Sequence, residues 1–318
     1  MTLATAARGR PGTSLAVGMT ALTPSPDAVL RLRGAPGFAA AMRASTAAAV
    51  RLYRGDRILN ALLSDRARAL FPHVALYLHF AEQRDGELGL TVGAMKEMCA
   101  RLDLCSGGRC EAMLALMRAA GLVASAANLD RRRRPLVPTD KLIALHQERW
   151  GVQFDAMSAV LPAAVVYRTA LNDPAFVKTF VLELGRRFIA GLRVLDGAPE
   201  LEPFAERTAG MVILFSLAQG AGPEQPFPPD EPVPLSINAL ATRFSVSRKH
   251  VLTLLRDAEE KGLLARGTDA ITILLRGREA IERMLATMFL YMAECAEVAL
   301  QAAGKDRDSA DVVVTLSA

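Results

Sequence analysis

The stretch that decides the fold runs from Leu90 to Thr139 and reads LTVGAMKEMCARLDLCSGGRCEAMLALMRAAGLVASAANLDRRRRPLVPT. Its first part predicts two helices separated by a tight turn. Thr91 and Ser106 each precede a helical pattern, and their hydroxyls can accept a hydrogen bond from an orphan amide of a first helical turn. We therefore expect one helix over residues 92–102 and a second that starts after Ser106.

The second of these helices has one apolar face. Its positions i, i+3, i+4 and i+7 are Cys110, Met113, Leu114 and Met117, so these side chains should share a buried side. Gly121 ends the helix, because glycine readily takes the left-handed conformation of a helix C-terminus.

Two short strands joined by a basic turn follow. Leu122-Val123 and Leu136-Val137 are the apolar segments, and four consecutive arginines, 131–134, lie in the turn between them. Thr139 then caps the next helix. Helix, turn, helix and a two-stranded ribbon with a basic tip form the order of a winged helix-turn-helix.

These residues resemble the multiple-antibiotic-resistance regulator (MarR) family. The resemblance rests on Gly121-Leu122-Val123, on Asp130-Arg131-Arg132 and on Leu136-Val137-Pro138-Thr139, and it covers about fifty residues. That family has a G-L-V step after its recognition helix, a D-x-R wing tip and a strand that ends in a threonine-capped helix. The resemblance implies a helix in the DNA major groove with a basic hairpin beside it.

The same pattern occurs a second time. Ser236 can cap a helix over residues 237–244, and Ser247 a helix that ends at Gly262, which lies 141 residues after Gly121. Two short strands follow, at residues 263–264 and 271–275. One shared spacing rarely arises by accident, so we interpret the chain as a fused pseudo-dimer of two winged helices.

The composition supports a helical protein, because alanine is abundant and aromatic residues make up only 5%. We predict a mainly α fold with small β-wings, in which tandem winged helix-turn-helix domains are joined by a helical bundle. The expected parts are a disordered segment (1–26), a helical segment (27–71), the first winged helix (72–138), a helical connecting region (139–219), a Pro-rich linker (220–234), the second winged helix (235–277), a C-terminal helix (278–303) and a tail (304–318).

We expect double-stranded DNA to meet the start of each recognition helix and the first wing. These candidate contacts are Ser106, Arg109, Arg131, Arg132, Arg133, Arg134, Ser247, Arg248, Lys249, His250 and Thr253. A net charge of +5 is compatible with such a partner. Four alternatives stay open: a first recognition helix without base contacts, wing arginines that form only a solvated charge run, an Arg132 that braces the wing through Asp130, and a His250 without a role.

The MarR resemblance also implies a pocket for a small-molecule effector between a winged lobe and the dimer helices. Trp150, Phe154, Tyr167 and Phe180 are the residues that we expect to line it, and the alternative is that they form plain core. The second wing, between the strands at residues 263–264 and 271–275, has Asp269 and no arginine cluster. We therefore expect this wing to contribute little to DNA contact.

Several classes of protein are disfavoured. The chain lacks a Walker loop, an HExxH and a G-x-S-x-G motif, so we expect no enzyme and no cofactor. The four cysteines lack CxxC spacing, so we expect no metal site, although a redox role for Cys105 stays open. We find no signal peptide and no membrane-spanning segment, and we expect a cytoplasmic protein.

The leading interpretation is therefore a sequence-specific transcription regulator, active as a monomer or a homodimer. A plasmid-type replication initiator also resembles a tandem winged-helix protein. The third hypothesis is a winged-helix protein-interaction module without DNA binding. The recognition helices of such modules lack cations, so Arg248 and Lys249 argue against it.

Overall fold

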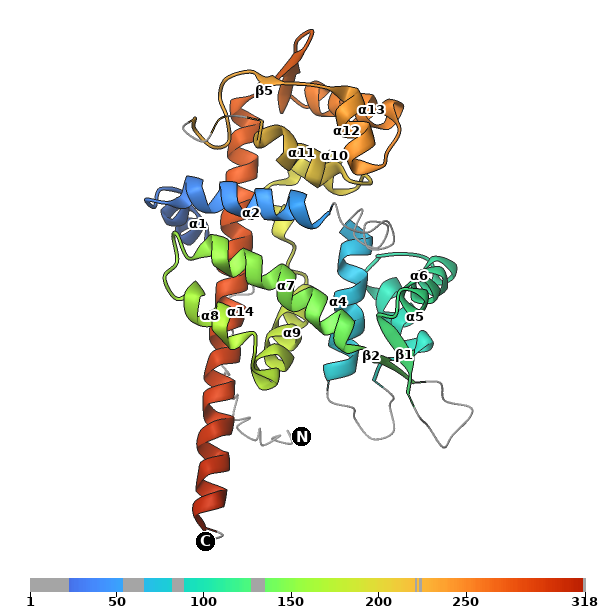
Figure 1. Cartoon of the computed structure of the whole chain (residues 1–318), viewed down its shortest axis with the longest axis vertical. Coiled ribbons are helices and arrows are strands. Elements are labelled where there is room, and N and C mark those ends of the chain that lie inside the picture. Colours follow the sequence, from blue (N-terminus) through green and yellow to red (C-terminus); the bar gives the residue numbers. More distant parts are fainter. Residues whose placement is uncertain are drawn as a thin grey trace, which may run out of the picture.

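The computed structural model describes residues 23–53, 66–81, 89–126, 135–220, 222 and 225–316, with side chains omitted for 66–69 and 305–316. The described chain is mainly helical and carries small antiparallel sheets (Figure 1). Residues 1–22, which belong to the segment predicted to be disordered, lie outside the described residues.

One compact group of elements, here called the N-terminal unit, follows the first 65 residues. It contains α4 (Arg66–Phe80), α5 (Val92–Arg101), α6 (Gly107–Ala119), β1 (Val123–Ser125) and β2 (Leu136–Pro138). The two strands pair antiparallel, with Val123 opposite Pro138. The predicted caps form: Thr91 Oγ1 accepts from Ala94 N at 3.0 Å, and Ser106 Oγ accepts from Arg109 N at 3.4 Å.

A second group, the C-terminal unit, repeats this order. It contains α11 (Gly210–Ala218), β3 (Val233–Pro234), α12 (Ile237–Phe244), α13 (Arg248–Glu260), β4 (Leu264–Arg266) and β5 (Ala270–Ile273). Strand β5 pairs antiparallel with both β3 and β4. In the N-terminal unit one backbone hydrogen bond, from Leu136 N to Leu90 O at 2.8 Å, occupies the place of β3.

The remaining helices surround and connect the two units. They are α1 (Pro26–Arg33), α2 (Phe38–Leu52), α7 (Asp140–Met157), α8 (Ala164–Ala170), α9 (Pro174–Ile189), α10 (Glu202–Ala205) and α14 (Leu275–Leu316), with 3-10 turns η1 (Val194–Gly197) and η2 (Pro199–Leu201). The N-terminus of α9 is stabilised by Asp173, whose Oδ1 accepts a hydrogen bond from Ala175 N at 2.9 Å. Pro174, which favours the first helical position, follows it.

The packing of these helices is reciprocal. Helix α2, which precedes the N-terminal unit, packs on α7 and on α11 of the C-terminal unit. Helix α9, which precedes the C-terminal unit, packs on α14 and on α4 of the N-terminal unit. Each unit is thus held by the helix that precedes the other unit, so neither half of the chain buries its apolar surface alone.

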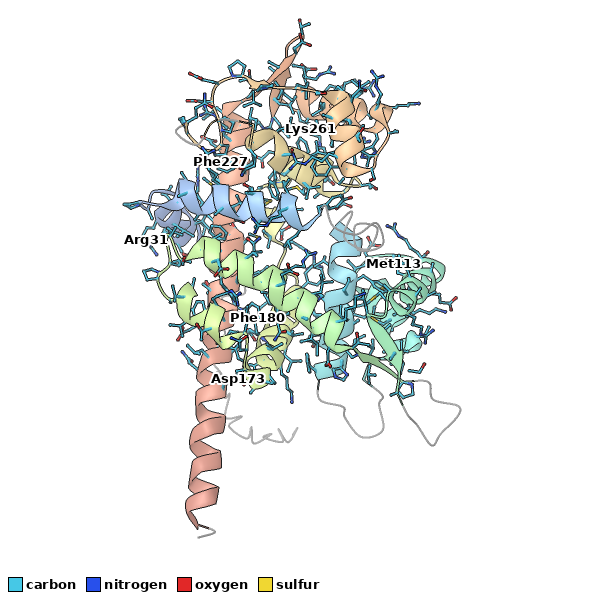
Figure 2. The ribbon with its side chains drawn as sticks, viewed as in Figure 1. Arg31, Met113, Asp173, Phe180, Phe227 and Lys261 are labelled. Carbon is cyan, nitrogen blue, oxygen red and sulfur yellow. The ribbon has the colours of Figure 1, made fainter. Side chains whose placement is uncertain are left out.

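The two units lie on the same side of the molecule in Figure 1, and their hairpins point toward opposite ends of its long axis. Helix α14 runs along that axis, and α2 and α7 cross it (Figure 1). Phe180, labelled in Figure 2, lies among the central helices, whereas Met113 lies inside the N-terminal unit.

Several predicted boundaries differ from the structure. Helix α4 continues through Pro72, so the boundary placed between residues 71 and 72 falls inside a helix. A proline removes one backbone donor, and packing against α9 keeps the helix continuous. Helix α14 reaches Leu316, so residues 304–316 of the predicted tail are helical. Strand β3 was missed, because its two residues lie in the proline-rich segment that predicts a linker.

The last part of the predicted helical connecting region, 139–219, forms two separate helices, α10 and α11. Helix α10 ends at Ala205, and Ala209, the N-cap of α11, has a left-handed φ of 58° that redirects the chain into α11. Gly210 follows because a Cβ atom there would lie 2.1 Å from the Phe204 carbonyl oxygen. The same connecting region is also interrupted between Met157, where α7 ends, and Ala164, where α8 starts.

Candidate functional site

The second helices of the two units, α6 and α13, are equivalent in detail. Both contain 13 residues, and Ser106 and Ser247 occupy their N-cap positions. Ser247 Oγ accepts from His250 N at 3.1 Å. Both helices are followed by a left-handed glycine, with φ of 69° at Gly121 and 68° at Gly262. The buried faces match as well, because Cys110, Met113, Leu114 and Met117 correspond to Val251, Leu254, Leu255 and Ala258.

The turns that precede these helices share one conformation. Asp103 and Ser245 both take positive φ, at 50° and 56°. A backbone hydrogen bond closes each turn, from Leu104 N to Cys99 O at 2.9 Å and from Val246 N to Ala241 O at 3.0 Å. The turn therefore fixes the angle at which α6 or α13 leaves its preceding helix.

A further shared contact was not predicted. Lys141 Nζ donates to Ala120 O at 2.9 Å, and Arg276 donates to Lys261 O at 3.0 Å. Lys141 and Arg276 each lie three residues after the last residue of the hairpin in their unit. Each binds a carbonyl at the C-terminus of the second helix, where positive charge is favoured. Thr139 Oγ1 likewise donates to Gly121 O at 2.7 Å, instead of accepting from an amide of α7 as predicted.

The first turns of the two helices differ sharply. Arg248 and Lys249 are exposed at the start of α13, and among the described residues neither side chain makes a hydrogen bond or ion pair. Their equivalents on α6 are Gly107 and Gly108. Arg109 is exposed, and Glu111 forms an ion pair with Lys96. At the first helical turn, exposed cationic side chains are therefore more numerous on α13 than on α6.

Two of the predicted contact residues on α13 are less available. His250 is half-buried, and its Nε2 lies 2.9 Å from the Thr208 carbonyl oxygen. Thr253 is also half-buried. Arg207 forms an ion pair with Asp257, so the α10–α11 connection holds α13 at two points.

The two hairpins can be compared only in part. The arginines at 131–134 lie outside the described residues. On the second hairpin Arg266 is directed back onto α13: its backbone N donates to Glu259 Oε1 at 3.0 Å and its Nε to Glu259 Oε2 at 2.7 Å. This arrangement agrees with a second wing that contributes little cationic surface.

A cavity of about 340 Å³ lies between α4, α7, α9, α14 and the segment that follows α9. Trp150 lines it. The other three residues predicted for a pocket pack into the core instead: Phe154 and Phe180 lie with ring centroids 5.6 Å apart, and Phe154 and Tyr167 at 5.7 Å. Aromatic residues on a buried helix face cannot be assigned to core or cavity wall from spacing alone.

Three cysteines meet where α5 turns into α6. Hydrogen bonds between thiols link Cys99 with Cys105 and with Cys110. Burial raises the pKa of the Cys99 and Cys110 thiols, which keeps them protonated and weakly nucleophilic. In the described part of the chain no three His, Cys, Asp or Glu side chains are arranged to hold a metal ion.

Across the ranges that the structure describes, none of the helices is both long enough and apolar enough for a membrane crossing. No family model, curated protein or solved structure matches this chain.

Proposed function

We propose that this protein is a sequence-specific double-stranded DNA-binding transcription regulator in which one chain supplies two winged helices as a pseudo-dimer. The observation that carries the proposal is the exposed pair Arg248 and Lys249 at the first turn of a capped helix, beside a hairpin. In helix-turn-helix proteins the N-terminal residues of the second helix contact base edges, and arginine and lysine are the commonest partners of guanine.

The reciprocal packing of the central helices supports the pseudo-dimer. Two-fold dimers place two recognition helices roughly 34 Å apart, about one turn of DNA. Here α6 and α13 lie on one side of the molecule, and the hairpins point toward opposite ends of the long axis (Figure 1). Since one chain encodes both halves separately, the two can read different sequences, and the preferred DNA site need not be palindromic.

The proposed contacts are unequal in the two units. On α13, base reading falls to Arg248 and Lys249, while Ser247 caps the helix and His250 positions it against Thr208. On α6, Ser106 caps the helix and Arg109 is the exposed cation. The arginines at 131–134 would supply phosphate or minor-groove contacts from the first wing.

A salt series of binding to random genomic duplex DNA, measured by fluorescence anisotropy, tests the proposal. Affinity should fall steeply with salt, with a slope of about −0.9 per neutralised phosphate contact. The double variant Arg248→Gln/Lys249→Gln removes two cations from the proposed DNA-facing surface and should bind at least about tenfold more weakly.

A matched control removes two charges from the far end of the same helix, as Arg256→Gln/Lys261→Gln. Arg256 pairs with Glu260, and Lys261 lies at the helix C-terminus (Figure 2). This variant should bind DNA nearly as the parent does. Equal losses in the two double variants would contradict a directed contact, and no affinity at low salt would favour a protein partner. Light scattering gives the mass, which should be that of one chain.

A further inference from the structure

Leu252, on α13, is exposed although it is a large apolar residue. Its exposed fraction is 42%, and it does not belong to the buried core of the described residues. The residues that α13 buries form a separate face and are Val251, Leu254, Leu255 and Ala258. Among the described large apolar side chains of α6 and α13, only Leu252 is exposed.

Leu252 is a neighbour of the two exposed cations at the start of α13. It follows Lys249 by three residues and Arg248 by four, and these are the spacings at which side chains lie next to each other on a helix surface. Leu252 therefore lies about 6 Å farther along the helix than Arg248. The three side chains form one outward surface in which an apolar group lies beside two positive charges.

The DNA major groove offers one apolar group to such a surface, the C5-methyl group of thymine. A leucine gains nothing from a phosphate, but it can cover this methyl group and exclude water from it. The offset of about 6 Å from Arg248 corresponds to at most about two base-pair steps of roughly 3.4 Å each. The apolar contact would thus lie close to a guanine that Arg248 or Lys249 contacts.

The backbone plan that the two units share does not require a leucine at this position. The equivalent residue of α6 is Glu111, since Cys110 corresponds to Val251. Glu111 is exposed and forms an ion pair with Lys96, so a charged residue fits the same place in the other unit. The exposed leucine is therefore a property of the surface of α13 and not of its fold.

We infer that Leu252 is a specificity-determining residue that contacts the C5-methyl group of a thymine, within about two base pairs of the guanine contacted by Arg248 or Lys249. The inference rests on the proposed function, because it needs α13 in the major groove of duplex DNA. It adds a base preference that the two cations do not supply, since neither guanine recognition nor a phosphate contact detects a methyl group.

Replacement of thymine by deoxyuridine tests the inference without a change in the protein, because uracil pairs as thymine does but lacks the C5-methyl group. The full chain first selects its site from a pool of random duplexes. The contacted guanine is the one whose preference is lost in Arg248→Gln or Lys249→Gln. Each thymine of the selected duplex is then replaced in turn, and affinity is measured by fluorescence anisotropy. One replacement near that guanine should weaken binding about fourfold, the contribution of one buried methyl group.

The variant Leu252→Ala connects this effect to one side chain. Alanine preserves the helix but is too short to make the same contact. This variant should bind the thymine and the uracil duplex equally, and it should bind random genomic duplex DNA as the parent does. The matched control is Leu275→Ala, which truncates a leucine that is 62% exposed at the start of α14 and should keep the fourfold difference of the parent.

The outcomes separate this inference from the proposed function. If the parent does not bind duplex DNA at low salt, both are overturned. If the parent binds its selected duplex but no uracil near the contacted guanine weakens it, only the inference is overturned. The same holds if Leu252→Ala keeps the difference between thymine and uracil, or if Leu275→Ala loses it.

Discussion

The N-terminal and C-terminal units share their backbone plan but not their surface. Both have a serine cap, a left-handed turn residue, a left-handed glycine and a cation on the last helical carbonyls. At the first turn of the second helix, however, Gly107 and Gly108 stand where the other unit has Arg248 and Lys249. Positions that define the backbone are therefore repeated, and positions that face outward have diverged.

A similar contrast separates the two central helix pairs. Between α2 and α7, Ser45 Oγ donates to Gln153 Oε1 at 2.6 Å, so the polar contact is neutral. Between α9 and α14 the contact is ionic: Arg187 is 1% exposed and bonds to Glu183 and Glu294. The packing of α9 on α14, beside the cavity, thus includes a buried ionic contact.

The largest expected effect is the loss of that charge. Replacing Arg187 by Ala removes the buried cation that bonds both Glu183 and Glu294, and leaves Glu183 with Arg186 alone. It should lower the free energy of unfolding by about 3 kcal/mol. The matched change in the other pair, Ser45→Ala, should cost about 1 kcal/mol. Urea unfolding followed by circular dichroism measures both.

The double variant Arg187→Met/Glu183→Leu is the control for this interpretation. It removes both buried charges and leaves Arg186 and Glu294, whose side chains reach solvent, so it should recover much of the loss. If the single and the double variant lose the same free energy of unfolding, the loss comes from packing at this position and not from unpaired charge.

Acid should weaken the half of the protein that contains His73 and His146. Burial lowers the pKa of these histidines to about 4 and about 3, from 6.5. The unfolded chain then binds protons first as the pH falls below 6.5, so stability is full above that pH and is lost toward pH 4. Each histidine should contribute a slope of about 1.4 kcal/mol per pH unit.

The variant His146→Leu checks the size of this effect. Between neutral pH and about pH 5, the free energy of unfolding of this variant should fall by roughly 2 kcal/mol less than that of the parent protein. Unfolding curves at several pH values measure the difference between the two proteins. Parallel pH profiles for parent and variant would show that His146 is protonated alike in the folded and unfolded states.

The backbone plan could be predicted from the sequence because it depends on local chemistry. Thr91, Ser106, Ser236 and Ser247 all make the expected cap bonds, and the four-residue apolar pattern of α6 is buried as expected. Helix ends set by long-range packing were harder, as the continuous α4 and the long α14 show.

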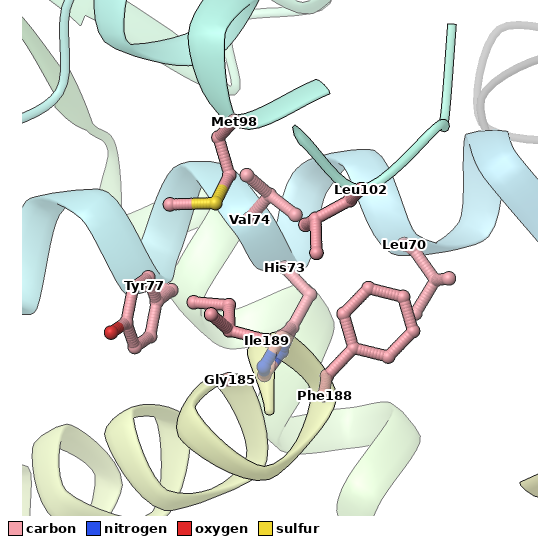
Figure 3. Close-up of a pocket in the computed structure, with 9 residues that line it drawn as sticks. All are labelled: Leu70, His73, Val74, Tyr77, Met98, Leu102, Gly185, Phe188 and Ile189. Carbon is pink, nitrogen blue, oxygen red and sulfur yellow. The ribbon is translucent and has the colours of Figure 1, made fainter. Parts of the chain in front are cut away.

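The cavity could be predicted only in part, since its wall combines residues from distant segments. Trp150 was expected there, but His73 and Tyr291 come from helices that meet only in the folded chain. Nothing in the local sequence separates His73 from an ordinary core histidine. Its ring points from α4 toward Gly185 of α9 (Figure 3) and forms a hydrogen bond with the backbone of Val181, more than 100 residues away.

The smallest expected effect sharpens the contrast between α6 and α13. A Cβ atom added at Gly108 meets no atom within 4 Å, so a side chain fits there without strain. Gly108→Lys copies Lys249 onto α6, and Gly108→Gln is the matched neutral control. Both should stabilise the protein by about 0.5 kcal/mol, the glutamine slightly more, because a positive charge near a helix N-terminus is disfavoured.

DNA binding should separate these two variants. If the start of α6 lies against DNA, the lysine variant gains about one phosphate contact, and its salt slope steepens by about 0.9 relative to the glutamine variant. The same anisotropy series used for α13 measures this. Identical slopes would place the start of α6 away from the duplex. The base contacts would then come from α13, and the N-terminal unit would chiefly support the helices around the cavity.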